Sequence, residues 1–273
     1  MRLVAILTTA LTVLACAQPG TAPAADSTGS AIDAALAGPH RSDANKARDV
    51  YRHPKETLQF FGLRDDMTVV EIWPGGGWYT EVLAPVLKDK GTLYAAHNVV
   101  PASGEMPNAL KNYRAKLEGN PELYSKVNVT ALGPDTFEIA PPGSADMVLT
   151  FRNIHNWMGR DYAPKVFEAA FRALKPGGTL GVEEHRANPA VPADPKAPSG
   201  YVNEDYAIKM IEAAGFKLVA KSDINNNPKD TKDYEKGVWT LPPTFRAGDV
   251  DREKYAAIGE SDRFTLKFQK PKG

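Results

Sequence analysis

The stretch Met67-Thr-Val-Val-Glu-Ile-Trp-Pro-Gly-Gly-Gly-Trp-Tyr79 decides the fold of this 273-residue chain. Its first six residues are rich in β-branched side chains, which favour a β-strand. The strand runs into the glycine turn 73–77, and a helix is expected from Trp78 to about Leu87, where Pro85 should kink or end it. Glycines let the backbone approach a ligand, and a helix N-terminus offers free amide groups. The stretch therefore predicts a ligand site at the end of a strand.

Strands and helices alternate along the rest of the chain. Further strands are expected at 91–96, 127–130, 146–151, 179–183, 216–221 and 262–269, and further helices at 43–61, 109–117, 162–174 and 203–214. This order predicts an α/β fold with a mainly parallel sheet that helices cover on both faces. The polar, proline-containing segment 225–259 is expected to form a mostly irregular cap between strands six and seven.

Composition excludes one class of function. The chain has 33 Lys and Arg against 33 Asp and Glu, so its formal net charge is zero. A broad nucleic-acid surface would need an excess of basic residues, and we expect no nucleic-acid partner. Cys16 is the only cysteine, so no intramolecular disulfide can form. The charged group Arg48, Asp49, Arg52 and His53 is either a solvated helix face or a lid over a ligand pocket.

The first fifteen residues are expected to be a signal peptide. Arg2 supplies a positive charge, and the apolar run Leu3–Leu14 is shorter than the roughly 20 residues that span a bilayer. The run ends in Val13-Leu-Ala-Cys16, which resembles a bacterial lipobox and makes its cysteine the lipidation site. The alternative is a plain secretory signal with a chance cysteine. Residues 16–38 are then the lipidated cysteine and a flexible tether, and 39–273 the folded domain.

The lipobox interpretation implies a place in the bacterial cell envelope, facing the periplasm and held to a membrane by lipid. Ala17 follows the cysteine. In Gram-negative lipoproteins, the absence of Asp at that position implies sorting to the outer membrane. One acyl chain binds a membrane weakly, whereas the several chains of a bacterial lipoprotein hold it firmly.

Several motifs together resemble those of class I S-adenosylmethionine-dependent methyltransferases. The first motif of that family is an acidic residue followed by G-x-G-x-G. Glu71 matches the acid, and Gly75 and Gly77 match the last two glycines, whereas Trp73 stands at the first glycine. Further similar segments follow in the family's order: the fourth-strand motif at 146–155, the LKPGG-x-L motif at 173–180 and the EAGF motif at 212–216. The resemblance covers residues 48–225 and the last strand.

The resemblance implies a Rossmann-like sheet of seven strands with an antiparallel last strand, and S-adenosylmethionine as cofactor. His97 and Asn98 stand where the family usually has an acid for the ribose hydroxyls, so they would bind a ribose without a charge-assisted hydrogen bond. Asp135 matches an acid near the adenine. The stretch 73–79 also looks like a bacterial subfamily of predicted exported methyltransferases of unknown substrate. The implied cofactor-binding residues are Glu71, Trp73, Gly75, Gly77, His97, Asn98 and Asp135.

Two residues are candidates for catalysis. His155 follows the expected fourth strand and Glu183 ends the fifth, at the edge where open α/β sheets bind ligands. An imidazole accepts a proton near neutral pH, although His155 has a structural hydrogen bond as its alternative role. Together with Glu184 and His185, these residues offer metal ligands. We favour polar residues lining a cleft, and expect no metal.

The sequence thus favours a methyltransferase that acts on a small molecule or an envelope component. The alternative is a non-catalytic ligand-binding or scaffold lipoprotein that reuses the fold. Trp73, His97 and export from the cytoplasm, where the cofactor is made, favour that alternative. A nicotinamide dehydrogenase is disfavoured, because its G-x-G-x-x-G pattern would need a glycine where Thr80 stands.

Replacing Cys16 by serine tests the lipid anchor. The variant lacks the thiol that would carry the lipid, so it should leave the membrane fraction or be processed incorrectly. Membrane fractionation compares it with the wild-type chain. Unchanged membrane association would contradict the anchor.

Overall fold

The computed structural model describes residues 27–98 and 105–273. The expected signal peptide and Cys16 lie outside these residues, so the lipid anchor stays a prediction. Within the described ranges, no helix has the length and apolar character needed to cross a membrane.

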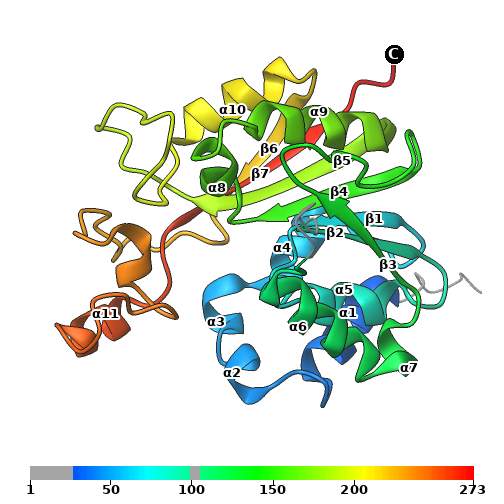
Figure 1. The fold of residues 1–273 in the computed structure, drawn as a ribbon, viewed down its shortest axis with the longest axis horizontal. Helices are drawn as coiled ribbons and strands as arrows, with labels where there is room; N and C mark the ends of the chain where they lie inside the picture. The colour runs from blue at the N-terminus through cyan, green and yellow to red at the C-terminus, as the bar shows by residue number, and fades with distance from the viewer. Residues whose placement is uncertain (1–26, 99–104) are drawn as a thin grey trace, which may run out of the picture.

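Seven strands form one sheet in the order β3-β2-β1-β4-β5-β7-β6 (Figure 1). Strands β1 to β5 pair in parallel, and β7 lies antiparallel between β5 and β6. The strand order reverses between β1 and β4, which is where ligands bind in such sheets. The expected mainly parallel Rossmann-like sheet with an antiparallel last strand is confirmed. The strands are β1 (Thr68–Ile72), β2 (Thr92–Asn98), β3 (Val127–Leu132), β4 (Ala145–Phe151), β5 (Leu174–His185), β6 (Lys217–Ser222) and β7 (Arg263–Gln269).

Helices cover both faces of this sheet (Figure 1). One face packs against α8 (Ile154–Met158), α9 (Ala163–Ala173) and α10 (Glu204–Ala213). The other packs against α1 (Ser27–Ala37), α4 (Pro54–Phe61), α5 (Thr80–Leu87), α6 (Asn108–Glu118) and α7 (Pro121–Tyr124). Successive strand residues point to opposite faces, so Val69 and Val70 contribute to different clusters of buried apolar residues.

The single helix expected over residues 43–61 is wrong. The segment forms α2 (Asp43–Lys46), α3 (Asp49–Arg52) and α4 instead. His53 takes a left-handed conformation with φ 40°, and Pro54 opens α4. Proline suits the first helical turn, where its missing N–H would have no partner, but it would break the interior of a longer helix.

The flexible tether expected for residues 16–38 is also wrong for its last part, because residues 27–37 form α1. Ile32 is 0% exposed, and it packs with Ala35 into the cluster that contains α5. Alanine is the strongest helix former, so the small residues that indicated a tether also favour a helix once Ile32 is buried. The folded part therefore includes residues from Ser27 onward.

Three other elements refine the expected ones. Helix α5 begins at Thr80 and continues past Pro85 to Leu87. The segment 175–178, expected to separate a helix from a strand, belongs to β5, and the backbone around Gly177 and Gly178 bonds Lys270. The cap is mostly irregular, as expected, but contains η1 (Gly237–Thr240) and α11 (Arg252–Ile258).

Truncating Ile32 to alanine should lower the free energy of unfolding by about 2–4 kcal/mol, the usual cost of such a change in a core. Chemical denaturation measures the effect. Asp33→Ala on the exposed side of the same helix is the control, since it removes only a surface ion pair with Lys55, for which an effect below about 1 kcal/mol is expected. If the two variants are equally stable, α1 does not contribute to the core.

Candidate functional site

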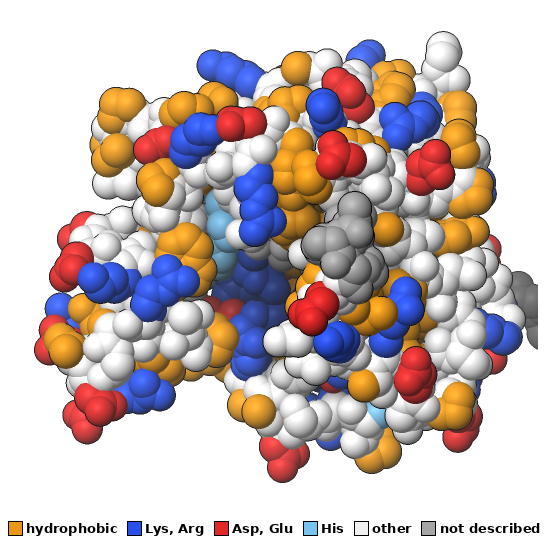
Figure 2. Space-filling model, viewed as in Figure 1, with side chains coloured by type: hydrophobic (Ala, Val, Ile, Leu, Met, Phe, Trp, Pro, Cys, Tyr) orange, Lys and Arg blue, Asp and Glu red, His pale blue; other side chains and the backbone are white. Residues whose placement is uncertain are grey.

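A cavity of about 390 Å³ opens at the carboxyl edge of the sheet. Its walls come from the glycine turn after β1, the segment after β4, the end of β5, the α2–α3 region and the cap. Figure 2 shows it as a hollow with Lys or Arg side chains (blue) inside and histidine (pale blue) on its wall. The volume lies within the range of roughly 300–1,000 Å³ that is typical of small-molecule sites.

The glycine turn leaves open space beside its backbone. Gly75 and Gly76 line the cavity, and a Cβ added to either residue would meet no atom within 4 Å. A ligand can therefore approach the backbone here, as the sequence predicts. Gly77 is different, because its Cβ would lie 3.1 Å from the ring of Tyr113 on α6. Gly77 thus lets α6 pack closely, and it does not line the cavity.

Trp73 takes the backbone conformation that a glycine would adopt easily. Its φ is 49°, a left-handed value that is rare for a bulky residue. The indole Nε1 donates a hydrogen bond of 3.1 Å to the carbonyl of Leu132 at the end of β3, and the ring packs against Trp157. The indole therefore covers the sheet edge towards β3 while also lining the cavity.

Glu71 lies beneath the turn. It is buried, and it accepts a hydrogen bond of 2.6 Å from the hydroxyl of Thr80, the first residue of α5. Burial raises the pKa of Glu71 to about 7. The contact links β1 to α5, and Glu71 does not reach the cavity wall.

The three residues expected near the ribose and adenine do not line the cavity either. The ring of His97 is buried, and its Nε2 lies 3.0 Å from the carbonyl of Gly75. Its Nδ1 accepts a hydrogen bond from the backbone of Asn98, so Nε2 carries the proton and donates. Burial also lowers the pKa of His97, which keeps the ring neutral. Asp135 is exposed on the β3–β4 connection. Their cofactor-binding roles stay predictions.

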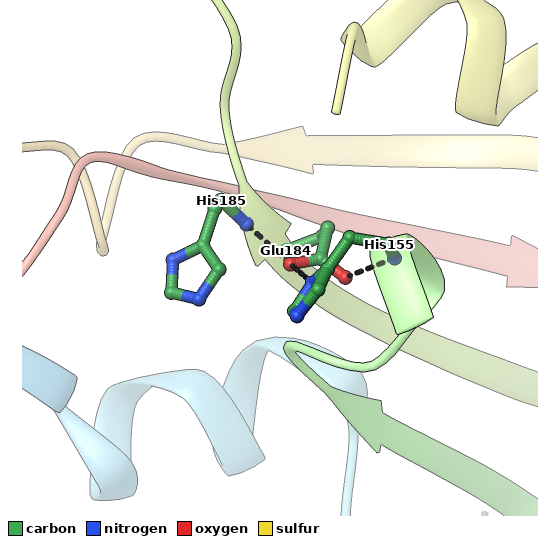
Figure 3. Close-up of side chains that lie close together, drawn as sticks. All are labelled: His155, Glu184 and His185. Carbon is green, nitrogen blue, oxygen red and sulfur yellow. Dashed lines mark hydrogen bonds and ion pairs between the residues drawn. The ribbon is translucent and has the colours of Figure 1, made fainter. Parts of the chain in front are cut away.

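His155 forms a pair with Glu184, a residue that the sequence interpretation placed only in the general cleft (Figure 3). The ring Nδ1 of His155 lies 3.1 Å from Glu184 Oε1, and the backbone N–H of His155 donates to Oε2. A carboxylate only accepts, so it holds the proton on Nδ1 and leaves Nε2 as the basic atom. Asn156 lies 3.0 Å from that Nε2. The ring of His155 lines the cavity.

His155, Glu184 and His185 are also the group that could hold a metal ion. One ligand atom of each lies within 4.8 Å of the others, and Figure 3 shows the carboxylate between the two rings. Each side chain already has a partner, however: His185 Nδ1 lies 2.6 Å from the hydroxyl of Ser261, and the backbone of His185 donates to Glu184. These contacts would orient the ring of His155 as readily as they would hold a metal ion.

Glu183 faces the other side of the sheet and does not line the cavity. It is fully buried, and its Oε1 lies 2.5 Å from Arg152 and 3.0 Å from Arg263. Tyr79 donates to its other oxygen. Although burial alone would raise it, the two guanidinium groups hold the pKa of Glu183 below its ordinary value. The geometry makes Glu183 a positioning residue for Arg152, and a direct catalytic role stays a prediction.

Arginines are the site residues that the sequence interpretation missed or left open. Arg48, Arg52 and Arg152 all line the cavity. Arg48 and Arg52 each bond Glu260, at 2.6 and 3.0 Å. Arg52 also lies 4.6 Å over the ring of Trp78. Burial, together with the nearby charge of Arg152, lowers the pKa of Arg52 to about 9. For Arg48 and Arg52, the lid interpretation fits these contacts better than the solvated face does, whereas Asp49 and His53 do not line the cavity.

Comparisons with known proteins agree on the architecture. No protein-family model and no curated protein matches the chain. A SAM-dependent methyltransferase from Aquifex aeolicus has a similar structure, with a TM-score of 0.54, 18% identity, and coverage of 88% of this chain and 97% of that one. The fold is that of class I S-adenosylmethionine-dependent methyltransferases. The exported subfamily stays a prediction.

Two more solved structures show how far the likeness reaches. The [4+2]-cyclase SpnF gives a TM-score of 0.57 at 17% identity, covering 91% of this chain and 94% of its own. The glycopeptide N-methyltransferase MtfA, complexed with sinefungin, gives 0.51 at 13%, covering 80% and 93%. At such identities the likeness establishes the fold alone.

Replacing Glu71 by glutamine should flatten the pH dependence of stability. The pKa of about 7 in the folded state lies well above the ordinary value for a glutamate carboxyl group, so the folded state holds this proton more tightly. Stability from this group is therefore complete below about pH 4.5 and is lost as the pH rises to 7. The variant should gain up to about 3 kcal/mol over wild type at pH 8, at ~1.4 kcal/mol for each pKa unit, and little at pH 4. Denaturation at both pH values measures this, and a constant difference would contradict the assignment.

Proposed function

We propose that this protein is an S-adenosylmethionine-dependent methyltransferase whose cofactor lies against Gly75 and Gly76. The observation that carries the proposal is the open space beside these two glycines, inside a cavity at the switch point of a methyltransferase fold. Such a turn presents backbone amide groups to a ligand. The cofactor, when bound, supplies an electrophilic methyl group on a sulfonium. The glycine turn fits that ligand, whereas His97 gives no charged contact to a ribose.

The chain's own contribution is to orient the acceptor and to take its proton. Glu184 holds the ring of His155 through Nδ1, which leaves Nε2 as the atom that would take a proton from an acceptor in the cavity, once the side-chain amide of Asn156 gives up its hydrogen bond to Nε2. Positioning the acceptor beside the methyl donor supplies much of the rate of such a transfer. The acceptor we propose is a small molecule or a component of the cell envelope, reached by a chain anchored through lipid on Cys16.

A second candidate is a ligand-binding protein, or an enzyme of another reaction class, on the same fold. The hydrogen bond from His97 to the carbonyl of Gly75 favours this second candidate, because the residue expected to bind the ribose already has a partner within the protein. The fold itself permits this, since one similar structure is named a [4+2]-cyclase. Cofactor binding separates the two candidates.

Calorimetric titration with S-adenosylmethionine and S-adenosylhomocysteine tests the cofactor site. Wild type should bind both. Gly76→Val should lose at least tenfold in affinity, because its side chain fills the open space without the strain of a positive φ. Ala34→Val, on the exposed face of α1, is the control for added bulk. Absence of binding by folded wild-type protein would favour the second candidate.

Replacing His155 by alanine should lower turnover by about 10²-fold or more, the scale for loss of a general base, once an acceptor is known. Cofactor affinity should stay within a few-fold. Glu184→Gln keeps the ring but weakens its orientation, so we expect a smaller loss and a shifted pH profile. Normal turnover by the alanine variant would leave His155 with a structural role.

A further inference from the structure

Three arginines, which we call the arginine cluster, lie in one wall of the cavity: Arg48, Arg52 and Arg152. Arg48 and Arg52 come from the α2–α3 region, and Arg152 follows β4. The side chains are only partly exposed, at 23%, 6% and 15%. Arg152 has a left-handed φ of 61°. Such a conformation in a non-glycine residue is uncommon and tends to occur at functional sites.

The cluster has more hydrogen-bond donors than the protein satisfies. A guanidinium group offers five N–H donors. Among the residues that the structure describes, each of these three groups makes one side-chain hydrogen bond, to Glu260 or to Glu183. Polar groups removed from bulk water normally find partners. The remaining donors of the cluster are therefore available to a ligand in the cavity.

The two carboxylates beside the cluster have little acceptor capacity left for these donors. Glu260 already accepts from Arg48 through one oxygen, and from Arg52 and Arg263 through the other. Glu183 accepts from Arg152, Arg263 and Tyr79. Within the described residues, these two carboxylates cannot satisfy most of the cluster's remaining donors, which leaves them for water or a ligand.

The charge of the site favours a negative ligand. Arg263 and the cluster give four guanidinium groups, against the carboxylates of Glu183, Glu184 and Glu260, so one positive charge remains when the histidines are neutral. S-adenosylmethionine is itself a net cation, because its sulfonium and ammonium outweigh its carboxylate. A cavity that holds both this charge and the cofactor therefore attracts an anionic ligand.

We propose that the arginine cluster binds a carboxylate or phosphate group of the methyl acceptor. The assignment of this anion to an acceptor rests on the proposed function, whereas the anion site itself does not. Planar guanidinium groups match both anions through paired hydrogen bonds. Arg152 lies three residues before His155 on the same segment, and both line the cavity. An anion on the cluster would therefore hold an acceptor within the cavity that His155 borders.

Calorimetry with inorganic phosphate and succinate, and with neutral succinamide, tests the site at low ionic strength. Wild type should bind the two anions and not succinamide, and added salt should weaken the binding. Arg48→Gln and Arg52→Gln should each weaken phosphate and succinate by at least tenfold. Arg48→Gln should disturb folding less than Arg52→Gln, because Glu260 still accepts hydrogen bonds from Arg52 and Arg263 in that variant. Arg64→Gln, an exposed arginine that pairs with Asp66, is the control and should bind as wild type does.

Two kinds of result would overturn the proposal. The first is that anion binding does not depend on the cluster, seen either as unchanged affinity in both folded variants or as no anion binding by wild type. The second is a loss of S-adenosylmethionine affinity in both variants with no change for methylthioadenosine, which lacks the carboxylate, since the cluster would then hold the cofactor. Anion binding without any cofactor binding would retain the anion site and refute methyl transfer.

Discussion

Two buried carboxylates, Glu183 and Glu260, fix the shape of the site. An ionised carboxylate away from water costs several kcal/mol unless cations and hydrogen bonds compensate it. Here the cations come from distant parts of the chain: Arg152 after β4, Arg263 in β7, and Arg52 in α3, which lies 208 residues from Glu260. Because Arg52 and Arg152 line the cavity, compensating the carboxylates also builds its cationic wall.

The site combines this cationic wall with an oriented imidazole and an open glycine turn. Glu184 sets the proton position on His155, and Gly76 leaves its backbone accessible. These features are the basis for the proposed transfer of a methyl group to an anionic acceptor. The residues expected to bind the nucleoside part of the cofactor fit that role less well, because Trp73 and His97 make contacts within the protein.

Local patterns predict most of the fold but only part of the site. The alternation of strands and helices and the turn 73–77 act through neighbouring residues, so the sheet and the opening at Gly75 follow from the sequence. The sequence did not predict helix α1, because its small residues are also typical of a tether and only the structure shows that Ile32 is buried in the same apolar cluster as α5. Pairs such as Arg52 with Glu260 depend on tertiary contacts that no spacing in the sequence encodes. Strand alternation places Glu183 and Glu184 on opposite faces, but only the structure shows that Glu184 is the one that meets His155.

A double-mutant cycle between Arg52 and Glu260 tests most directly whether the buried ion network holds the cavity wall together. The free energy of unfolding is measured for wild type, Arg52→Gln, Glu260→Gln and the double variant. Glu260→Gln alone should cost about 3–5 kcal/mol, because it leaves guanidinium groups buried without a counter-charge. Arg52→Gln should then cost less in that background than in wild type, with a coupling of at least about 1 kcal/mol. Additive effects, within about 0.5 kcal/mol, would show that the two residues do not depend on each other and would contradict this account.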